Sequence, residues 1–203
     1  SSIAMTILEI VIPCFNEEEN IPRLIESLNH VGDLCDISFI LVDNGSLDNT
    51  RKVIEQHLSK RIRGVFLTKN LGYGGGILAG LQESNGDYVG WMHADLQTDP
   101  ACLVEFVPNL NSKTLLKGKR FGRSIADQLF TFGMSIFETL TFRRLLWDIN
   151  GQPTIACREW ILGLANPPND FSFDLYIYVN ARLSGFTVER TSVFFGPRFR
   201  GVS

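Results

Sequence analysis

The sequence predicts an α/β fold with a mostly parallel central sheet, on the strength of two observations. Short apolar segments typical of buried strands alternate with segments whose apolar residues recur at helical spacing. Polar or glycine-rich loops follow each of the first four expected strands. Such alternation produces parallel strands through right-handed crossovers, and ligands gather at the carboxyl ends of those strands. We therefore expect the four loops to meet at one edge of the sheet.

The first expected strand, residues 7–12, is nearly all apolar, as a strand buried on both faces should be. Asn16 is expected to cap the helix that follows. Glutamates 17–19 would occupy its first turn, where the helix dipole favours acidic groups. Apolar residues then recur at the spacing of one helix face. They are Ile21, Leu24, Ile25 and Leu28.

Three more strands are expected at residues 37–42, 64–67 and 87–92. Asp48 opens the helix after the first of these, and residues 77–83 belong to the helix after the second. The second half of the chain is less regular. Its expected elements are strands at 115–119 and 186–194, helices at 126–142 and 171–183, and a loop at 147–153.

Composition narrows the classes of function. A net charge of −3 argues against wrapping nucleic acid. The four cysteines form no C-x-x-C pair, which disfavours a structural zinc site and favours a reducing, cytoplasmic setting. No signal peptide is visible, and the richest apolar stretch, residues 128–137, is too short to span a bilayer. We expect a single domain, with residues 1–4 as a remnant of cloning before a native start at Met5.

The glycine-rich segment at residues 72–76 offers exposed backbone N–H groups at the start of a helix, which is a natural phosphate site. A flexible turn is the alternative. Gly74, Gly76 and Ala79 also satisfy the G-x-G-x-x-A pattern of dinucleotide-binding proteins. That pattern requires a tight turn directly after the strand, and residues 68–71 intervene, so a dinucleotide site is not favoured.

Asp43 ends the second strand, where its carboxylate could accept hydrogen bonds from a base or a ribose. The alternative is an Asx-turn followed by a helix cap. That alternative explains Asn44, Ser46 and Asp48 well and Asp43 less well.

After the fourth strand, His93, Asp95 and Gln97 alternate. Asp95 suits Mg²⁺ or Mn²⁺, which usually join one or two carboxylates to a substrate diphosphate, and Gln97 could complete the shell. Asp99 before Pro100 is expected to cap the next helix, and His93 on its own is more typical of a turn.

Two cationic groups and one acidic pair complete the candidates. The first group is Lys117, Lys119, Arg120 and Arg123, for which a solvated surface is the favoured interpretation when the run is taken alone. The second group is Arg198 with Arg200. Asp170 and Asp174 are four residues apart and are expected to share a helix face. They are either a cap with a surface acid or a pair that faces the site.

Four stretches together resemble the family 2 glycosyltransferases of the GT-A fold. They are IPCFNEEEN at 12–20, LVDNGSLDNT at 41–50, NLGYGGG at 70–76 and HADLQ at 93–97. The resemblance covers nearly the whole chain and is strongest to dolichyl-phosphate mannose synthases and bacterial polyprenyl-phosphate glycosyltransferases. The final FFGPRFRGVS is similar to their last catalytic segment, which in some members precedes membrane helices. This suggests a truncated soluble form.

The resemblance implies a GT-A Rossmann-like α/β/α sandwich, with residues 5–110 as the nucleotide-sugar half and 111–203 as the acceptor half. It places Asp95 and Gln97 at the metal, Arg120 and Arg123 at the acceptor phosphate, and Asp95, Asp174 and Arg198 in catalysis. The residues implied to bind the nucleotide-sugar are Pro13, Phe15, Glu17, Asp43, Asn44, Lys69, Gly72, Gly74, His93 and Asp95.

Three positions depart from the family pattern. His93 replaces the first aspartate of Asp-x-Asp, which removes one carboxylate and would favour Mn²⁺ if the imidazole coordinates. Asn44 replaces a second aspartate, and Gly118-Lys119-Arg120 replaces Gly-Ser-Arg.

We expect an inverting glycosyltransferase that uses a UDP-, GDP- or CDP-linked sugar and a polyprenyl-phosphate acceptor. A phosphate acceptor is already nucleophilic, whereas a hydroxyl would need Asp174 or Asp170 as a base. The alternatives are a nucleotidyltransferase, although residues 13–20 lack the glycines it would use, and a non-catalytic nucleotide-sugar-binding module. The expected helix at 126–142 is rich in phenylalanine, and it could contact a membrane surface or pack in the core.

Overall fold

The computed structural model describes residues 7–121 and 149–194. The expected helix at 126–142 and the candidate residues Arg123 and Arg198 lie outside this part of the chain. Within it, the strands form one seven-stranded sheet in the order β3-β2-β1-β4-β6-β5-β7. The strands are β1 (Leu8–Cys14), β2 (Ile37–Asn44), β3 (Ile62–Leu67), β4 (Tyr88–Trp91), β5 (Thr114–Phe121), β6 (Thr154–Cys157) and β7 (Thr187–Phe194).

The sheet is mostly parallel, as predicted. Only the two pairings of β6, with β4 and with β5, are antiparallel among the pairings that the structure describes. Six strands therefore point the same way, and the carboxyl ends of β1 to β4 share one edge. The loops that follow these four strands start from that edge.

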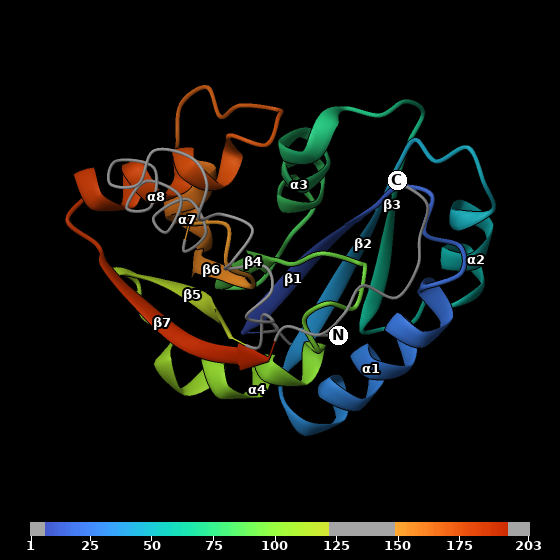
Figure 1. Cartoon of the computed structure of the whole chain (residues 1–203), viewed down its shortest axis with the longest axis horizontal. Coiled ribbons are helices and arrows are strands. Elements are labelled where there is room, and N and C mark those ends of the chain that lie inside the picture. Colours follow the sequence, from blue (N-terminus) through green and yellow to red (C-terminus); the bar gives the residue numbers. More distant parts are fainter. Residues whose placement is uncertain (1–6, 122–148, 195–203) are drawn as a thin grey trace, which may run out of the picture.

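Helices cover both faces of the sheet and complete the α/β/α sandwich (Figure 1). Helices α1, α2 and α4 pack on one face, and α3, α7 and α8 pack on the other. Their bounds are α1 (Ile21–Leu34), α2 (Thr50–Gln56), α3 (Gly72–Gln82), α4 (Leu103–Phe106), α7 (Arg158–Leu162) and α8 (Phe173–Leu183).

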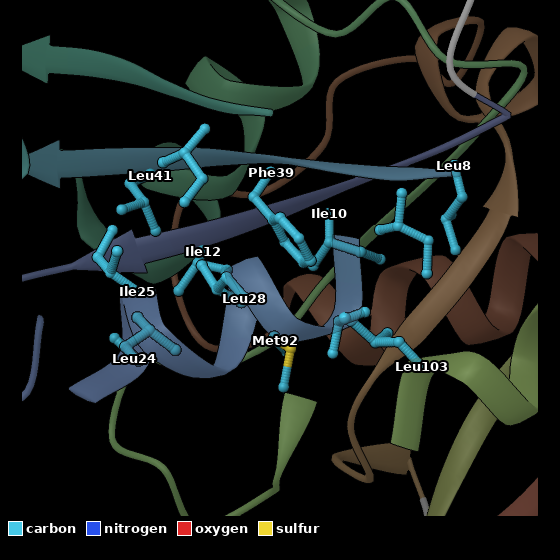
Figure 2. Close-up of a cluster of buried hydrophobic side chains, with 14 of the residues drawn as sticks. Leu8, Ile10, Ile12, Leu24, Ile25, Leu28, Phe39, Leu41, Met92 and Leu103 are labelled. Atoms are coloured by element: carbon cyan, nitrogen blue, oxygen red, sulfur yellow. The ribbon is translucent and has the colours of Figure 1, made fainter. Parts of the chain in front are cut away.

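Alternation along the central strands divides the core between the two faces. Leu8, Ile10 and Ile12 of β1 belong to the same buried cluster as Leu24 and Leu28 of α1, and Ile12 lies near both in Figure 2. The intervening Val11 belongs to the cluster beneath α3 and α8. Both clusters consist of fully buried side chains, so the central strands are apolar on both faces, as the sequence predicted.

The prediction that Asn16 caps α1 is wrong, because the helix begins at Ile21 and Asn20 is its N-cap residue. Asn16 instead has a positive φ of 52°, and its side-chain oxygen accepts the N–H of Leu47 at 2.9 Å. The glutamates at 17–19 lie in the turn before the helix. Asp48 was expected to open the next helix, and the structure places it two residues before the start of α2 at Thr50. Its carboxylate accepts the Thr50 N–H at 2.9 Å.

The sequence did not predict β6 or α7. Strand β6 has only four residues and is buried between two neighbours, so it shows no alternation to recognise. The expectation for Asp99 is confirmed, since its carboxylate accepts the N–H of Ala101 at 2.9 Å and opens the turn at 100–102. Among residues 7–121 and 149–194, no helix is both long enough and apolar enough to span a membrane.

A buried carboxylate fixes the start of β4. Glu9 is 3% exposed, and it accepts hydrogen bonds from the N–H groups of Asn85 and Gly86 and from Arg63 at 2.6 Å. Burial by itself raises the pKa of Glu9, but the hydrogen bonds from Asn85, Arg63 and Gly86 outweigh it and hold the pKa below its ordinary value. Glu9 therefore favours the folded state when it is ionised.

Replacing Glu9 by glutamine is expected to lower the free energy of unfolding by about 2 kcal/mol at neutral pH, since the charged hydrogen bonds are lost. A lowered pKa in the folded state means that this stabilisation is complete above the ordinary pKa of 4.5. It disappears as the pH falls through the lower folded-state value. Urea unfolding of both proteins at several pH values measures the difference in their unfolding free energies. If that difference does not become smaller in acid, the charge of Glu9 has no stabilising role.

Candidate functional site

The loops after β1 and β2 are joined by hydrogen bonds into one unit. The N–H of Asn16 donates to Ser46 Oγ at 3.1 Å, and the N–H of Glu17 donates to Thr50 Oγ1 at 2.8 Å. The loop after β2 also contacts the loop after β3. A Cβ on Gly45 would lie 2.4 Å from the backbone of Lys69, and Gly45 has a positive φ of 71°, so only glycine fits there.

Asp43, for which the Asx-turn alternative was the weaker explanation, is the residue that closes the turn after β2. The carboxylate of Asp43, not of its neighbours, closes the Asx-turn by accepting the Ser46 N–H at 3.0 Å. Asn44 instead fastens β2 to the glycine-rich segment, because its Oδ1 accepts the Leu71 N–H at 2.9 Å and its Nδ2 donates to the Gly72 carbonyl at 3.0 Å. Both side chains are buried.

The glycine-rich segment is packed more tightly than the sequence suggested. The N–H of Gly72 donates to the Asn70 side chain at 2.8 Å, and the N–H of Gly75 donates to the Asn169 carbonyl at 3.0 Å. The expectation of exposed N–H groups is therefore wrong for these two residues. A Cβ on Gly74 would lie 2.4 Å from the Pro168 carbonyl oxygen, so close approach of residues 168–169 already explains this glycine. A role for Gly72 and Gly74 in nucleotide binding stays a prediction.

The ends of β1 and β2 are electrostatically negative. Burial raises the pKa of the Cys14 thiol well above its ordinary value, and the carboxylates of Glu17 and Asp43 raise it further. Nearby, burial raises the pKa of Asp48, but hydrogen bonds from Thr50 and from the Glu18 N–H lower it overall. This corner suits donors such as the N–H and O–H groups of a nucleoside better than it suits phosphate oxygens.

Asp95 lies just beyond the end of β4, in a short turn. Its side chain is 9% exposed, and its Oδ1 accepts the N–H of Gln97 at 3.1 Å. Leu96 between them has a positive φ of 60°, an uncommon conformation for leucine that lets the turn fold back on Asp95. The Gln97 and His93 side chains are half-buried beside it.

Tyr73 connects the segment after β3 with residues from the second half of the chain. Its hydroxyl donates to Asp174 Oδ2 at 2.7 Å and accepts from Gln152 Nε2 at 2.9 Å. Its ring lies 5.6 Å from the His93 ring and stacks on Phe171 at 5.3 Å, measured between centroids. Gln152 in turn accepts the backbone N–H of His93. The loop after β4 is thereby joined to the segment after β3, so all four strand-end loops meet, as predicted.

Asp174 faces this network and is 4% exposed. Its second oxygen, Oδ1, accepts the indole N–H of Trp91 at 2.9 Å. The expectation that Asp170 and Asp174 share a helix face is wrong, because α8 begins at Phe173. Asp170 precedes the helix, where hydrogen bonds from the Ser172 side chain and backbone lower its pKa. Asp174 is the acid at the site, and Asp170 caps an exposed turn.

Lys117 contradicts the interpretation of its segment as a solvated surface. It is fully buried in β5, and its ammonium group donates to Thr154 Oγ1 at 2.8 Å. Lys119, two residues later, is exposed. Position 120 continues the same strand, but the structure does not describe its side chain.

The remaining predicted residues sit at the same edge. Pro13 is half-buried near the end of β1 and lies 3.4 Å from the position of a Cβ on Gly76. Phe15 is 42% exposed in the next loop, and Glu17 accepts the Asn20 side-chain amide at 2.6 Å. Lys69 is exposed in the loop after β3.

Sequence reasoning missed Tyr73, Trp91 and Gln152. Tyr73 lies within the glycine-rich motif, and Trp91 ends the strand before the HADLQ motif, where an aromatic donor is a usable signal. Gln152 gives no such signal, because its partners lie 59 and 79 positions away along the chain.

Comparison with known proteins identifies relatives of the chain. Undecaprenyl-phosphate 4-deoxy-4-formamido-L-arabinose transferases from Proteus mirabilis and Pectobacterium carotovorum are 35% and 38% identical to it over 108 and 110 residues. Each match covers 51% of this chain but only 32% of the relative, so the chain spans about a third of their length. A Mycobacterium bovis glycosyltransferase is 28% identical over 202 residues, covering 96% of this chain and 87% of that protein.

Solved structures show the same fold. Glucosyl-3-phosphoglycerate synthase from Mycobacterium tuberculosis, in complex with Mn²⁺, UDP and glucosyl-3-phosphoglycerate, superposes with a TM-score of 0.68 at 21% identity. The match covers 96% of this chain and 72% of the synthase. A second mycobacterial protein gives a TM-score of 0.72 at 19% identity, over 96% of this chain and 68% of that one. These likenesses support the GT-A fold.

A model of the protein family described as "Glycosyl transferase family 2" matches residues 9–157. The matched range runs from β1 to β6 and contains the four strand-end loops that meet at the carboxyl edge of the sheet. The family is the one that the motifs resemble, and it replaces the nucleotidyltransferase alternative. The chain belongs to glycosyl transferase family 2.

Proposed function

We propose that this chain transfers a sugar from a nucleotide-sugar to a polyprenyl phosphate, with inversion at the anomeric carbon. The observation that supports the proposal is that contacts link the four strand-end loops to one another along the carboxyl edge of the sheet. The undecaprenyl-phosphate acceptor in the names of the bacterial relatives supports a lipid phosphate. Four cysteines without disulfides suit a cytoplasmic location.

Residues 5–110 would bind the donor. The nucleoside would lie against Pro13, Phe15 and Asp43, since carboxylate oxygens such as those of Asp43 can accept the N–H and O–H groups of a base or a ribose. The diphosphate would then lie on the other side, toward Asp95. Lys69 and Arg198 are proposed as its cationic partners.

A divalent ion fits this arrangement. Mg²⁺ and Mn²⁺ commonly take one or two carboxylates from the protein and further oxygens from phosphate and water. The described residues contain no group of three or more His, Cys, Asp or Glu side chains able to hold a metal. A metal at Asp95 would therefore take its other ligands from substrate oxygens. When bound, such an ion would offset the charge that builds on the leaving diphosphate. We propose Asp95 as its ligand, with Gln97 beside it.

Residues 111–203 would bind the acceptor, with Arg120 and Arg123 at its phosphate. A phosphate oxygen is already an anionic nucleophile, so no side chain has to remove a proton. This agrees with the position of Asp174, whose two oxygens each accept a hydrogen bond from the protein. We propose that Asp174 holds Tyr73 and Trp91 in place and does not act as a general base.

The test has two stages. Thermal-shift assays with UDP, GDP and CDP, each with and without Mn²⁺, are expected to show stabilisation by one nucleotide that depends on the metal. The matching nucleotide-sugars are then incubated with undecaprenyl phosphate or, as the control, 3-phosphoglycerate. Transfer to the lipid alone supports the proposal. Transfer to 3-phosphoglycerate would contradict the acceptor, and binding without any turnover would identify a non-catalytic module.

A further inference from the structure

The outward face of α8 is unusual among the helices in residues 7–121 and 149–194. Its inward face carries the buried Phe173, Ile177 and Ala181. A helix with that pattern normally presents polar side chains to water. Here the outward side instead carries an apolar stripe, which begins just before the helix and which consists of Phe171, Leu175, Val179 and Leu183, exposed by 80%, 38%, 43% and 81%.

Helix α1 provides an internal comparison. It packs on the opposite face of the sheet, and its exposed positions include Arg23, Glu26, His30 and Asp33. The corresponding surface of α8 has a single charged residue, Arg182, in the last turn beside Leu183. The helix has one carboxylate, Asp174, and it is turned inward to Trp91 and Tyr73. Within α8 the apolar stripe therefore has no outward carboxylate and ends at a cation, while the exposed Asp170 lies beside Phe171 before the helix begins.

The apolar stripe is also continuous with the candidate acceptor site. Phe171, its first residue, stacks on Tyr73, whose hydroxyl binds Asp174. Successive members are four residues apart, so the stripe advances about 6 Å along the helix at each step. It thus leads away from the site over the outer surface of α8.

We propose that this apolar stripe is a membrane-docking surface, on which α8 lies at the bilayer interface and turns the acceptor site toward the lipid. The inference rests on the proposed function, because a lipid-phosphate acceptor keeps its chain in the bilayer and must be met there. Arg182 suits anionic headgroups, and the four apolar side chains would enter the acyl boundary. A whole-protein electrostatic attraction is excluded by the net charge of −3, so the contact depends on the stripe itself.

Vesicle co-sedimentation tests the proposal without nucleotide or acceptor. The 203-residue chain is expected to bind vesicles of phosphatidylethanolamine and phosphatidylglycerol. Leu183→Glu and Val179→Glu should each reduce the bound-to-free ratio about tenfold or more, because each removes an apolar contact and adds an anion. The matched control is Leu47→Glu in the loop after β2, because Leu47 is 88% exposed but lies away from α8. Thermal unfolding confirms that the variants fold.

Two results would contradict the proposal that the apolar stripe docks on a membrane. One is a chain that does not bind vesicles at all, and the other is equal binding by Leu183→Glu and Leu47→Glu. If light scattering instead shows a dimer that Leu183→Glu dissociates, and vesicles are not bound, the stripe is a contact between two copies. Vesicle binding that survives alongside an absence of sugar transfer would refute the proposed function and leave the docking surface standing.

Discussion

Replacing Asp95 by asparagine will reduce sugar transfer by about 100- to 1000-fold, the usual cost of removing one electrostatic group from a reacting centre. Asparagine keeps the size of the side chain and an oxygen for the Gln97 N–H, so the turn after β4 should persist. The negative charge that would attract a divalent ion is lost. Stabilisation by nucleotide should accordingly stop depending on Mn²⁺.

Asp99→Asn is the matched control for that variant. Asp99 lies four residues further along, is exposed, and accepts a similar hydrogen bond from the N–H of Ala101 at 2.9 Å. Its replacement should leave both turnover and metal dependence within about twofold, since surface changes of this kind are nearly neutral. Equal losses in the two variants would mean that the charge at Asp95 has no special role.

Among the substitutions proposed here, Asp174→Ala will lower the free energy of unfolding the most, by about 2–4 kcal/mol. Two donors, Trp91 Nε1 and the Tyr73 hydroxyl, lose their acceptor at once, and each unsatisfied buried group costs about 1–3 kcal/mol. The ring contacts of Tyr73 with His93 and Phe171 should loosen as well. Denaturant unfolding measures the loss directly.

Asp170→Ala is the internal control, because this acid is exposed and serves only the Ser172 turn. Its loss of stability should be clearly smaller. Asp174→Asn then separates structure from chemistry. If no general base is needed, this variant should retain most of the sugar transfer to a lipid phosphate. A loss of about 100-fold or more in the transfer rate of a folded variant would instead show that Asp174 acts as the base.

The first half of the fold could be predicted because its signals are local. Strands β1 and β2 are continuous apolar runs, and α1 repeats its apolar residues along one face. The carboxyl edge follows from the parallel order of these strands alone. The wrong cap at Asn16 and the wrong choice of residue for the Asx-turn after β2 have one cause: several side chains in a loop can accept the same N–H groups, and the fold decides which one does.

The second half depends on contacts that sequence spacing does not contain. Strand β6 exists because it fits between β4 and β5, and Lys117 is buried because β5 lies between β6 and β7. Tyr73 and Asp174 are 101 positions apart, so no local pattern could have paired them. The candidate residues were chosen by motif, but the network that connects them was not predicted.

The central claim is that the strand-end loops form a single nucleotide-diphosphate site with a metal at Asp95. A crystal grown with UDP and MnCl₂, measured near the manganese absorption edge, tests it most directly. We expect an anomalous peak at about 2.1 Å from an Asp95 carboxylate oxygen, with the diphosphate beside it and the uracil near Asp43. Nucleotide density elsewhere, or manganese bound away from Asp95, would contradict it.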